Sequence, residues 1–116
     1  MALILVADDN TTFADLVGAL LEDAGHQVVK AYSGLAAIAV VEQHPVDAAV
    51  LDVLIPQISG DAVAQRLRQL RPGLPIALMT GADQSFAAGA GLPVLRKPFT
   101  REELLAVIER MRLPAA

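Results

Sequence analysis

Five short apolar segments alternate with helix-like segments along the chain, and this alternation constrains the fold more than any other feature of the sequence. The segments at 2–7, 46–51 and 76–79 are almost continuously apolar, which is typical of strands buried on both faces of a sheet. The segment at 26–31 is half polar, as expected of an edge strand, and the segment at 94–95 is the shortest. We therefore predict five strands.

Helical periodicity fills the intervals between these strands. In the first interval an apolar residue recurs every three or four positions, which predicts a helix with one apolar face. That face consists of Phe13, Leu16, Val17, Leu20 and Leu21. Asn10 is placed to cap the amino end of this helix, and Gly25 is placed to end it.

Similar signals predict the later helices. Ser33 is placed to cap a second helix, and a third helix stops near Pro72. Thr100, followed three residues later by Glu103, is a capping-box pattern that opens the last helix. The segment at 81–92 is rich in alanine and glycine, so we expect at most a short or degenerate fourth helix there.

Strands and helices in this order form a parallel sheet covered by helices on both faces, because each crossover between parallel strands is right-handed. We expect one α/β domain over residues 1–116, built as a three-layer sandwich. In such sheets ligands bind beyond the carboxyl ends of the strands.

Composition excludes several classes of function. Apolar residues make up 54 % of the chain and aromatic residues 3 %, which predicts an aliphatic core. The net charge of −4 and the lack of a basic stripe argue against direct nucleic-acid binding. The chain has no cysteine, so disulfides, thiol chemistry and cysteine-based zinc sites are excluded. No apolar run approaches the ~20 residues that cross a bilayer, and we expect a soluble, cytoplasmic protein without membrane contact.

The polar residues that follow the predicted strands are unusual in kind. Asp8 and Asp9 follow the first strand, Asp52 the third, Thr80 the fourth and Lys97 the fifth. Carboxylates that converge at one edge repel one another unless a cation lies between them, and hard oxygen ligands suit Mg²⁺ or Mn²⁺. A carboxylate beside such an ion can attack phosphorus and become an acyl phosphate. The alternatives are strand-end aspartates without function and a structural salt bridge between Asp52 and Lys97.

Four motifs together resemble the receiver domain of two-component response regulators, over the whole chain. They are the acidic pair Asp8-Asp9, Asp52 within the segment 51–60, the pair Thr80-Gly81, and the triplet Lys97-Pro98-Phe99. The resemblance implies a flavodoxin-like (βα)5 fold with strand order 2-1-3-4-5. It also implies a phosphoacceptor that receives its phosphoryl group from a histidine kinase or a phosphotransfer protein and signals by a conformational change.

The resemblance assigns the metal site to four residues. Asp9 and Asp52 would bind Mg²⁺ directly, with help from the backbone carbonyl of Leu54. Asp8 would mainly orient a water molecule on the metal.

The remaining roles concern the phosphoryl group. Asp52 would accept it, Lys97 would pair with it, and Thr80 would move towards it and report its arrival. Gly81 would leave room for it. The Lys97-Pro98 peptide bond would be cis, which aims the lysine inward.

The sequence also departs from the family pattern. Val94 stands where many receivers carry an aromatic residue, and the segment between Thr80 and Lys97 is shorter than usual. The chain therefore resembles compact receivers of hybrid histidine kinases or single-domain regulators, and we expect its output through the first helix and the loop after the fifth strand. Leu54 and Ala82 cannot hold a hydrolytic water molecule by a hydrogen bond.

Two other functions compete with this hypothesis. One is a receiver-like interaction module that is regulated without phosphorylation. The other is a metal-dependent phosphatase, but enzymes of that type place a second acid two residues after the nucleophile, where this chain has Leu54. We expect no enzymatic turnover beyond self-phosphorylation and self-dephosphorylation, a monomer or weak dimer, and output by contact with another protein.

Overall fold

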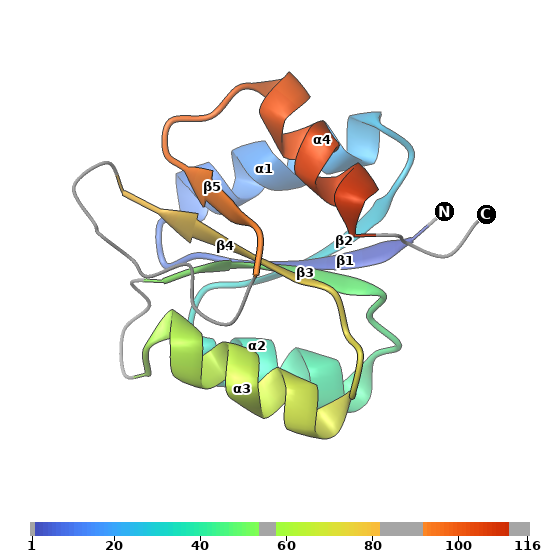
Figure 1. The fold of residues 1–116 in the computed structure, drawn as a ribbon, viewed down its shortest axis with the longest axis vertical. Helices are drawn as coiled ribbons and strands as arrows, with labels where there is room; N and C mark the ends of the chain where they lie inside the picture. Colours follow the sequence, from blue (N-terminus) through green and yellow to red (C-terminus); the bar gives the residue numbers. More distant parts are fainter. Residues whose placement is uncertain (1, 54–57, 82–91, 112–116) are drawn as a thin grey trace.

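The computed structural model describes residues 2–53, 58–81 and 92–111. Strands and helices alternate along this part of the chain, as the sequence predicts (Figure 1). In order, the elements are β1 (Leu3–Ala7), α1 (Thr11–Asp23), β2 (Gln27–Ala31), α2 (Gly34–Gln43), β3 (Ala48–Asp52), α3 (Gly60–Leu70), β4 (Ile76–Thr80), β5 (Val94–Arg96) and α4 (Arg101–Arg110).

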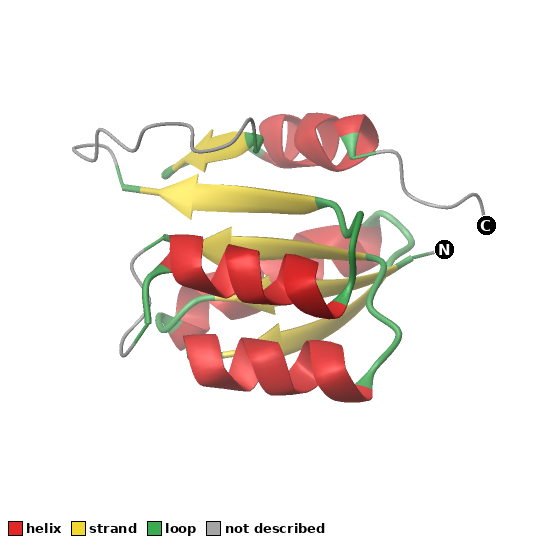
Figure 2. Ribbon diagram, turned by 60° about the horizontal axis from the view of Figure 1, so that its bottom comes forward, coloured by secondary structure: helices red, strands yellow, loops and turns green. Residues whose placement is uncertain are grey.

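The five strands form one parallel sheet in the order β2-β1-β3-β4-β5, which confirms the predicted flavodoxin-like topology. The half-polar strand β2 lies at one edge of the sheet, as expected. Because all strands run in the same direction, their carboxyl ends meet at one edge (Figure 2).

The helices cover both faces of the sheet. α1 and α4 lie on one face, and α2 and α3 lie on the other (Figure 1). Alternate residues of each central strand face opposite sides, so Ile4 and Val6 pack in the core beneath α1 and α4, whereas Leu5 packs in the core beneath α2 and α3. Both cores are almost wholly aliphatic, as the composition indicates.

Side-chain caps define where the helices begin. The predicted N-caps are confirmed for α1, α2 and α4, the last with a complete capping box. Ser59 caps α3 in the same way, by accepting a hydrogen bond from the backbone N–H of Ala62 at 3.3 Å. These caps satisfy backbone donors that otherwise have no partner in the helix.

The apolar face predicted for α1 does not coincide fully with its buried face. Leu16 is 53 % exposed, and the buried positions are Ala14, Val17, Gly18 and Leu21. The reason is that small residues allow α1 to lie close to the sheet. A Cβ atom on Gly18 would lie only 3.3 Å from Val28 in β2, so the helix turns this side inward and turns Leu16 outward.

Two predictions lie outside the described residues. The short or degenerate fourth helix falls on 82–91, and the carbonyl of Leu54 falls in the segment 54–57. Within the described part of the chain, no helix has the length and apolarity needed to cross a membrane.

Arg71, directly after α3, joins that helix to the carboxyl end of α2. Its guanidinium donates hydrogen bonds to the backbone carbonyl oxygens of Val41 at 3.1 Å, His44 at 2.6 Å and Val46 at 3.1 Å. Carbonyls at the end of a helix lack partners within the helix, so one planar cation here serves several acceptors.

We predict that Arg71→Met lowers the free energy of unfolding by about 2 kcal/mol, because it removes charge-assisted hydrogen bonds to these carbonyls. Urea denaturation measures the change. Arg71→Lys should recover less than half of the loss, since an ammonium cannot reproduce the planar set of donors, and Arg66→Met on exposed α3 surface is the control. A loss below about 0.5 kcal/mol for Arg71→Met would contradict this role.

Candidate functional site

The carboxyl edge of the sheet gathers the polar residues that the sequence places after the strands. Asp8 and Asp9 follow β1, and Asp52 ends the neighbouring strand β3. Thr80 ends β4, and Lys97 follows β5. The strand register aligns these ends, because Ala7 pairs with Leu51, immediately before Asp8 and Asp52 respectively.

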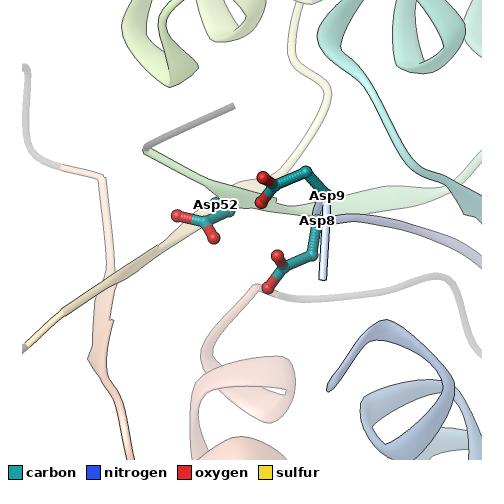
Figure 3. Close-up of side chains that lie close together, drawn as sticks. All are labelled: Asp8, Asp9 and Asp52. Carbon is teal, nitrogen blue, oxygen red and sulfur yellow. The ribbon is translucent and has the colours of Figure 1, made fainter. Parts of the chain in front are cut away.

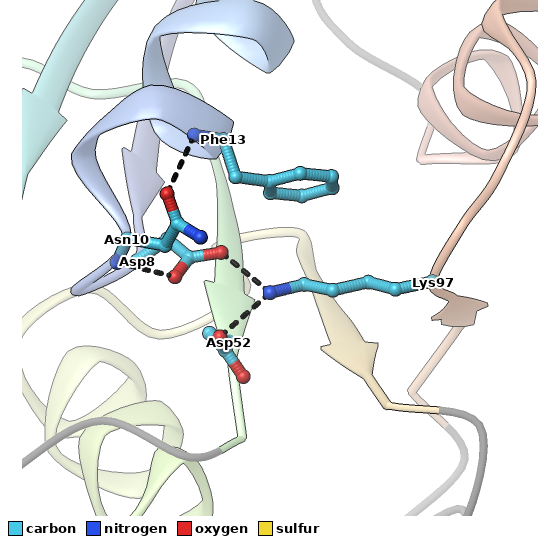
Figure 4. Close-up of polar contacts among 5 residues, drawn as sticks. All are labelled: Asp8, Asn10, Phe13, Asp52 and Lys97. Atoms are coloured by element: carbon cyan, nitrogen blue, oxygen red, sulfur yellow. Dashed lines mark hydrogen bonds and ion pairs between the residues drawn. The ribbon is translucent and has the colours of Figure 1, made fainter.

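Lys97 connects two of the carboxylates. Its Nζ lies 2.7 Å from Oδ2 of Asp8 and 2.8 Å from Oδ2 of Asp52 (Figure 4). Asp8 is fully buried and Asp52 is 6 % exposed. Oδ1 of Asp8 also accepts a hydrogen bond from the backbone N–H of Asn10 at 2.9 Å, so both oxygens of this carboxylate have partners.

Three carboxylates form a cluster with the chemistry of a metal site. One oxygen from each of Asp8, Asp9 and Asp52 lies within 4.8 Å of the others (Figure 3). Asp9 is exposed and the other two are buried, so the cluster opens to solvent on one side. The surrounding cleft is lined by Asp8, Asp9, Asn10, Asp52, Gly81 and Lys97. This set of hard oxygen donors, with an open side for water, fits Mg²⁺ or Mn²⁺.

The electrostatics of the site reflect an excess of negative charge. Burial raises the pKa of the Asp8 carboxyl above its ordinary value, and the hydrogen bond from Lys97 offsets part of this effect. Burial lowers the pKa of the Lys97 ammonium, but the hydrogen bonds to Asp52 and Asp8 outweigh it and leave the pKa raised. The two carboxylates therefore share one ammonium group, and Lys97 remains protonated.

Thr80 and the segment after β5 complete the edge. The side chain of Thr80 is buried at 1 % exposure, and its backbone carbonyl accepts a hydrogen bond from the N–H of Lys97 at 2.7 Å. The Lys97-Pro98 peptide bond is cis, as predicted. Val94 lies half-buried against the core beneath α2 and α3.

Sequence analysis missed one residue of this site. The Lys97 ammonium packs against the face of the Phe13 ring, with Nζ 4.4 Å from the ring centroid (Figure 4). Helical periodicity places Phe13 on the buried face of α1, and it does pack at the margin of that core. A cation–π contact between residues 84 positions apart leaves no pattern in one sequence, although the scarcity of aromatic residues draws attention to each of them.

Comparison with known proteins identifies the family. The family model of the response regulator receiver domain matches residues 4–109. This chain therefore belongs to the response regulator receiver domain family.

Curated relatives show the same relationship. The chain is 36 % identical over 107 residues to the probable transcriptional regulatory protein TcrX of Mycobacterium tuberculosis, a match that covers 88 % of this chain and 46 % of TcrX. It is 33 % identical over 111 residues to the alkaline phosphatase synthesis transcriptional regulatory protein PhoP of Bacillus subtilis, covering 91 % of this chain and 46 % of PhoP. The chain thus spans about half the length of these relatives.

Solved structures share the fold over nearly the whole chain. A CheY-like receiver domain protein from Methanospirillum hungatei is 27 % identical, with a TM-score of 0.87 over 95 % of this chain and 92 % of the other. A putative response regulator from Chloroflexus aurantiacus is 33 % identical, with a TM-score of 0.86 over 95 % of this chain and 96 % of the other.

We predict that Asp8→Asn raises the free energy of unfolding of the metal-free protein at neutral pH. Because folding raises the pKa of Asp8, its ionised form favours the unfolded state, and asparagine removes this cost. The advantage should shrink as the pH falls through the folded pKa, since protonation then stabilises the wild-type fold.

Urea denaturation in a chelating buffer at several pH values measures this difference. Asp23→Asn, at an exposed ion pair with Arg101, is the matched control. If Asp8→Asn were less stable than wild type at neutral pH, the ion pair with Lys97 would outweigh the cost of burying the carboxylate.

Proposed function

We propose that this domain is the phosphoacceptor of a two-component or phosphorelay system and that Asp52 receives the phosphoryl group. The observation that supports this assignment best is the contact of the Lys97 ammonium with the buried Asp52 carboxylate, inside an open acidic cleft. The donor would be a histidine kinase or a phosphotransfer protein. Output would follow from a change of conformation and contact with another protein or domain.

In the proposed reaction, an oxygen of Asp52 attacks the phosphorus of a phosphohistidine. The new O–P bond forms as the N–P bond breaks, and the imidazole leaves with the electron pair. Lys97 places a positive charge beside Asp52, where negative charge gathers on the phosphoryl oxygens. Thr80 would supply a hydroxyl donor to the same group, and Gly81 lines the cleft that the group would enter.

The acidic cluster would hold the divalent ion that this reaction needs. Asp9 and Asp52, with the carbonyl of Leu54, would bind Mg²⁺ or Mn²⁺ directly, and Asp8 would orient a bound water molecule. The ion would neutralise charge on the transferring phosphoryl group. The engagement of both Asp8 oxygens by Asn10 and Lys97 is in keeping with an indirect role for Asp8.

Two alternatives remain distinct in their consequences. A receiver-like module regulated without phosphorylation would bind its partner equally well with and without a phosphodonor. A phosphatase would turn over many esters through an aspartyl phosphate.

We predict that incubation with Mg²⁺ and acetyl phosphate adds one phosphoryl group to the protein, as an acyl phosphate on Asp52. Intact mass spectrometry measures the addition, and hydroxylamine should remove it. Asp52→Asn should abolish the labelling, because an amide oxygen is a far weaker nucleophile than a carboxylate. Asp23→Asn is the control and should be labelled like wild type.

The same incubation separates the alternatives. A folded protein that gains no mass would point to the module without phosphorylation. Steady release of phosphate from several unrelated esters would point to the phosphatase.

We further predict that the phosphorylated form gets no help in hydrolysis from the side chain two residues after Asp52. Leu54→Asn should therefore lose its phosphoryl group several-fold faster than wild type, because a carboxamide can hold the attacking water by a hydrogen bond. Release of phosphate after removal of the donor measures the rate, with Leu54→Met as the apolar control. A Leu54→Asn rate equal to that of wild type would contradict this explanation.

A further inference from the structure

We propose that Phe13 is a positioning residue for Lys97, and that the face of its ring holds the ammonium beside Asp52 by a cation–π contact. The contact itself is independent of the proposed function, whereas its kinetic consequence rests on that function. Figure 4 shows the arrangement, with the ring, both carboxylates and the ammonium converging from three segments of the chain.

The ammonium has three N–H donors, and two of them are used by Asp8 and Asp52 at 2.7 and 2.8 Å. The ring of Phe13, with its centroid 4.4 Å from Nζ, is the third partner. The Lys97 side chain is 23 % exposed, so water screens the attraction between the ammonium and the ring only in part. The ammonium is therefore held on several sides by groups that attract a cation.

Two further contacts keep the ring in place. The backbone N–H of Phe13 donates to the Asn10 side chain at 3.0 Å, which fixes this residue in the first turn of α1. Phe99, two residues after Lys97, meets the ring edge-to-face, with centroids 5.5 Å apart and an angle of 84°. The segment that carries the lysine therefore also supports the ring on which the lysine rests.

The ring differs from the carboxylates in one respect that matters for function. Asp8 and Asp52 belong to the cluster that would serve a divalent cation, so under the proposed function that cation would compete with Lys97 for their charge. An aromatic face offers no ligand to Mg²⁺, and its attraction for the ammonium stays available. We infer that Phe13 keeps Lys97 in the cleft when its contacts with the carboxylates weaken.

Nuclear magnetic resonance can test the contact without any phosphorylation. The chain has two lysines, so selective labelling gives one signal set from Lys97 and one from Lys30 as an internal control. The ε-methylene protons of Lys97 should be shifted upfield by the ring in wild type, and this shift should disappear in Phe13→Leu and persist in Phe13→Tyr. Lys97 signals that are the same in wild type and Phe13→Leu would overturn the proposed contact.

Kinetics then test the positioning role. At saturating Mg²⁺, Phe13→Leu should be phosphorylated by acetyl phosphate about fivefold more slowly than wild type, the effect of a cation–π contact of ordinary strength. Phe13→Tyr should keep the wild-type rate, because its ring face is equivalent. A Phe13→Leu protein that is folded and phosphorylated at the wild-type rate would overturn the role.

A second series separates the ring's charge distribution from its shape. Phenylalanines carrying increasing numbers of fluorine atoms, introduced at position 13 alone, preserve the packing and progressively remove the negative face of the ring. The phosphorylation rate should fall steadily along this series, which also serves if Phe13→Leu does not fold. A flat series would show that Phe13 only fills space. If wild type accepted no phosphoryl group at all, the proposed function would fail, and the resonance measurements would still decide the contact.

Discussion

The ion pair between one ammonium and two buried carboxylates is the interaction on which the site depends. A buried carboxylate without a partner is expensive, and Asp8 is fully buried. Lys97 supplies a single positive charge to both Asp8 and Asp52, and Asp9 adds a third carboxylate at the open side. The site is therefore stable enough to form and still carries excess negative charge. This excess of negative charge favours the binding of a divalent cation.

The strand order of the parallel sheet explains how these charged residues come close together. β1 and β3 are neighbours, so Asp8 and Asp52 lie side by side although 44 residues separate them in the sequence. Lys97 follows β5, two strands away from β3, and its long side chain spans the end of β4. The hydrogen bond from its backbone N–H to the carbonyl of Thr80 fixes the point from which that side chain starts. The strand order and this backbone hydrogen bond together bring two carboxylates and a distant ammonium into contact.

The features that sequence analysis predicted are those with a local or a periodic signal. Short stretches of sequence are enough to identify the apolar runs, the cap residues Asn10 and Ser33 and the capping box at Thr100. The structure confirms all of them. The exposure of Leu16 was not predicted. Periodicity identifies a broad apolar stripe on the helix, but it cannot tell which side of that stripe packs against the sheet through small residues. The contact of Phe13 with Lys97 depends on tertiary structure, and the spacing of these residues along the sequence gives no sign of it.

The placement of the aromatic rings has a consequence for how a change at Asp52 would spread. Val94 packs on the side of the sheet that carries α2 and α3, whereas Phe13 and Phe99 lie on the side of α1 and α4. Many receivers place a ring at the position of Val94, and here that position cannot transmit a ring movement. A displacement of Lys97 would act first on the two rings that contact it or each other. We therefore expect the response to reach α1 and the connection between β5 and α4 before it reaches α2 or α3.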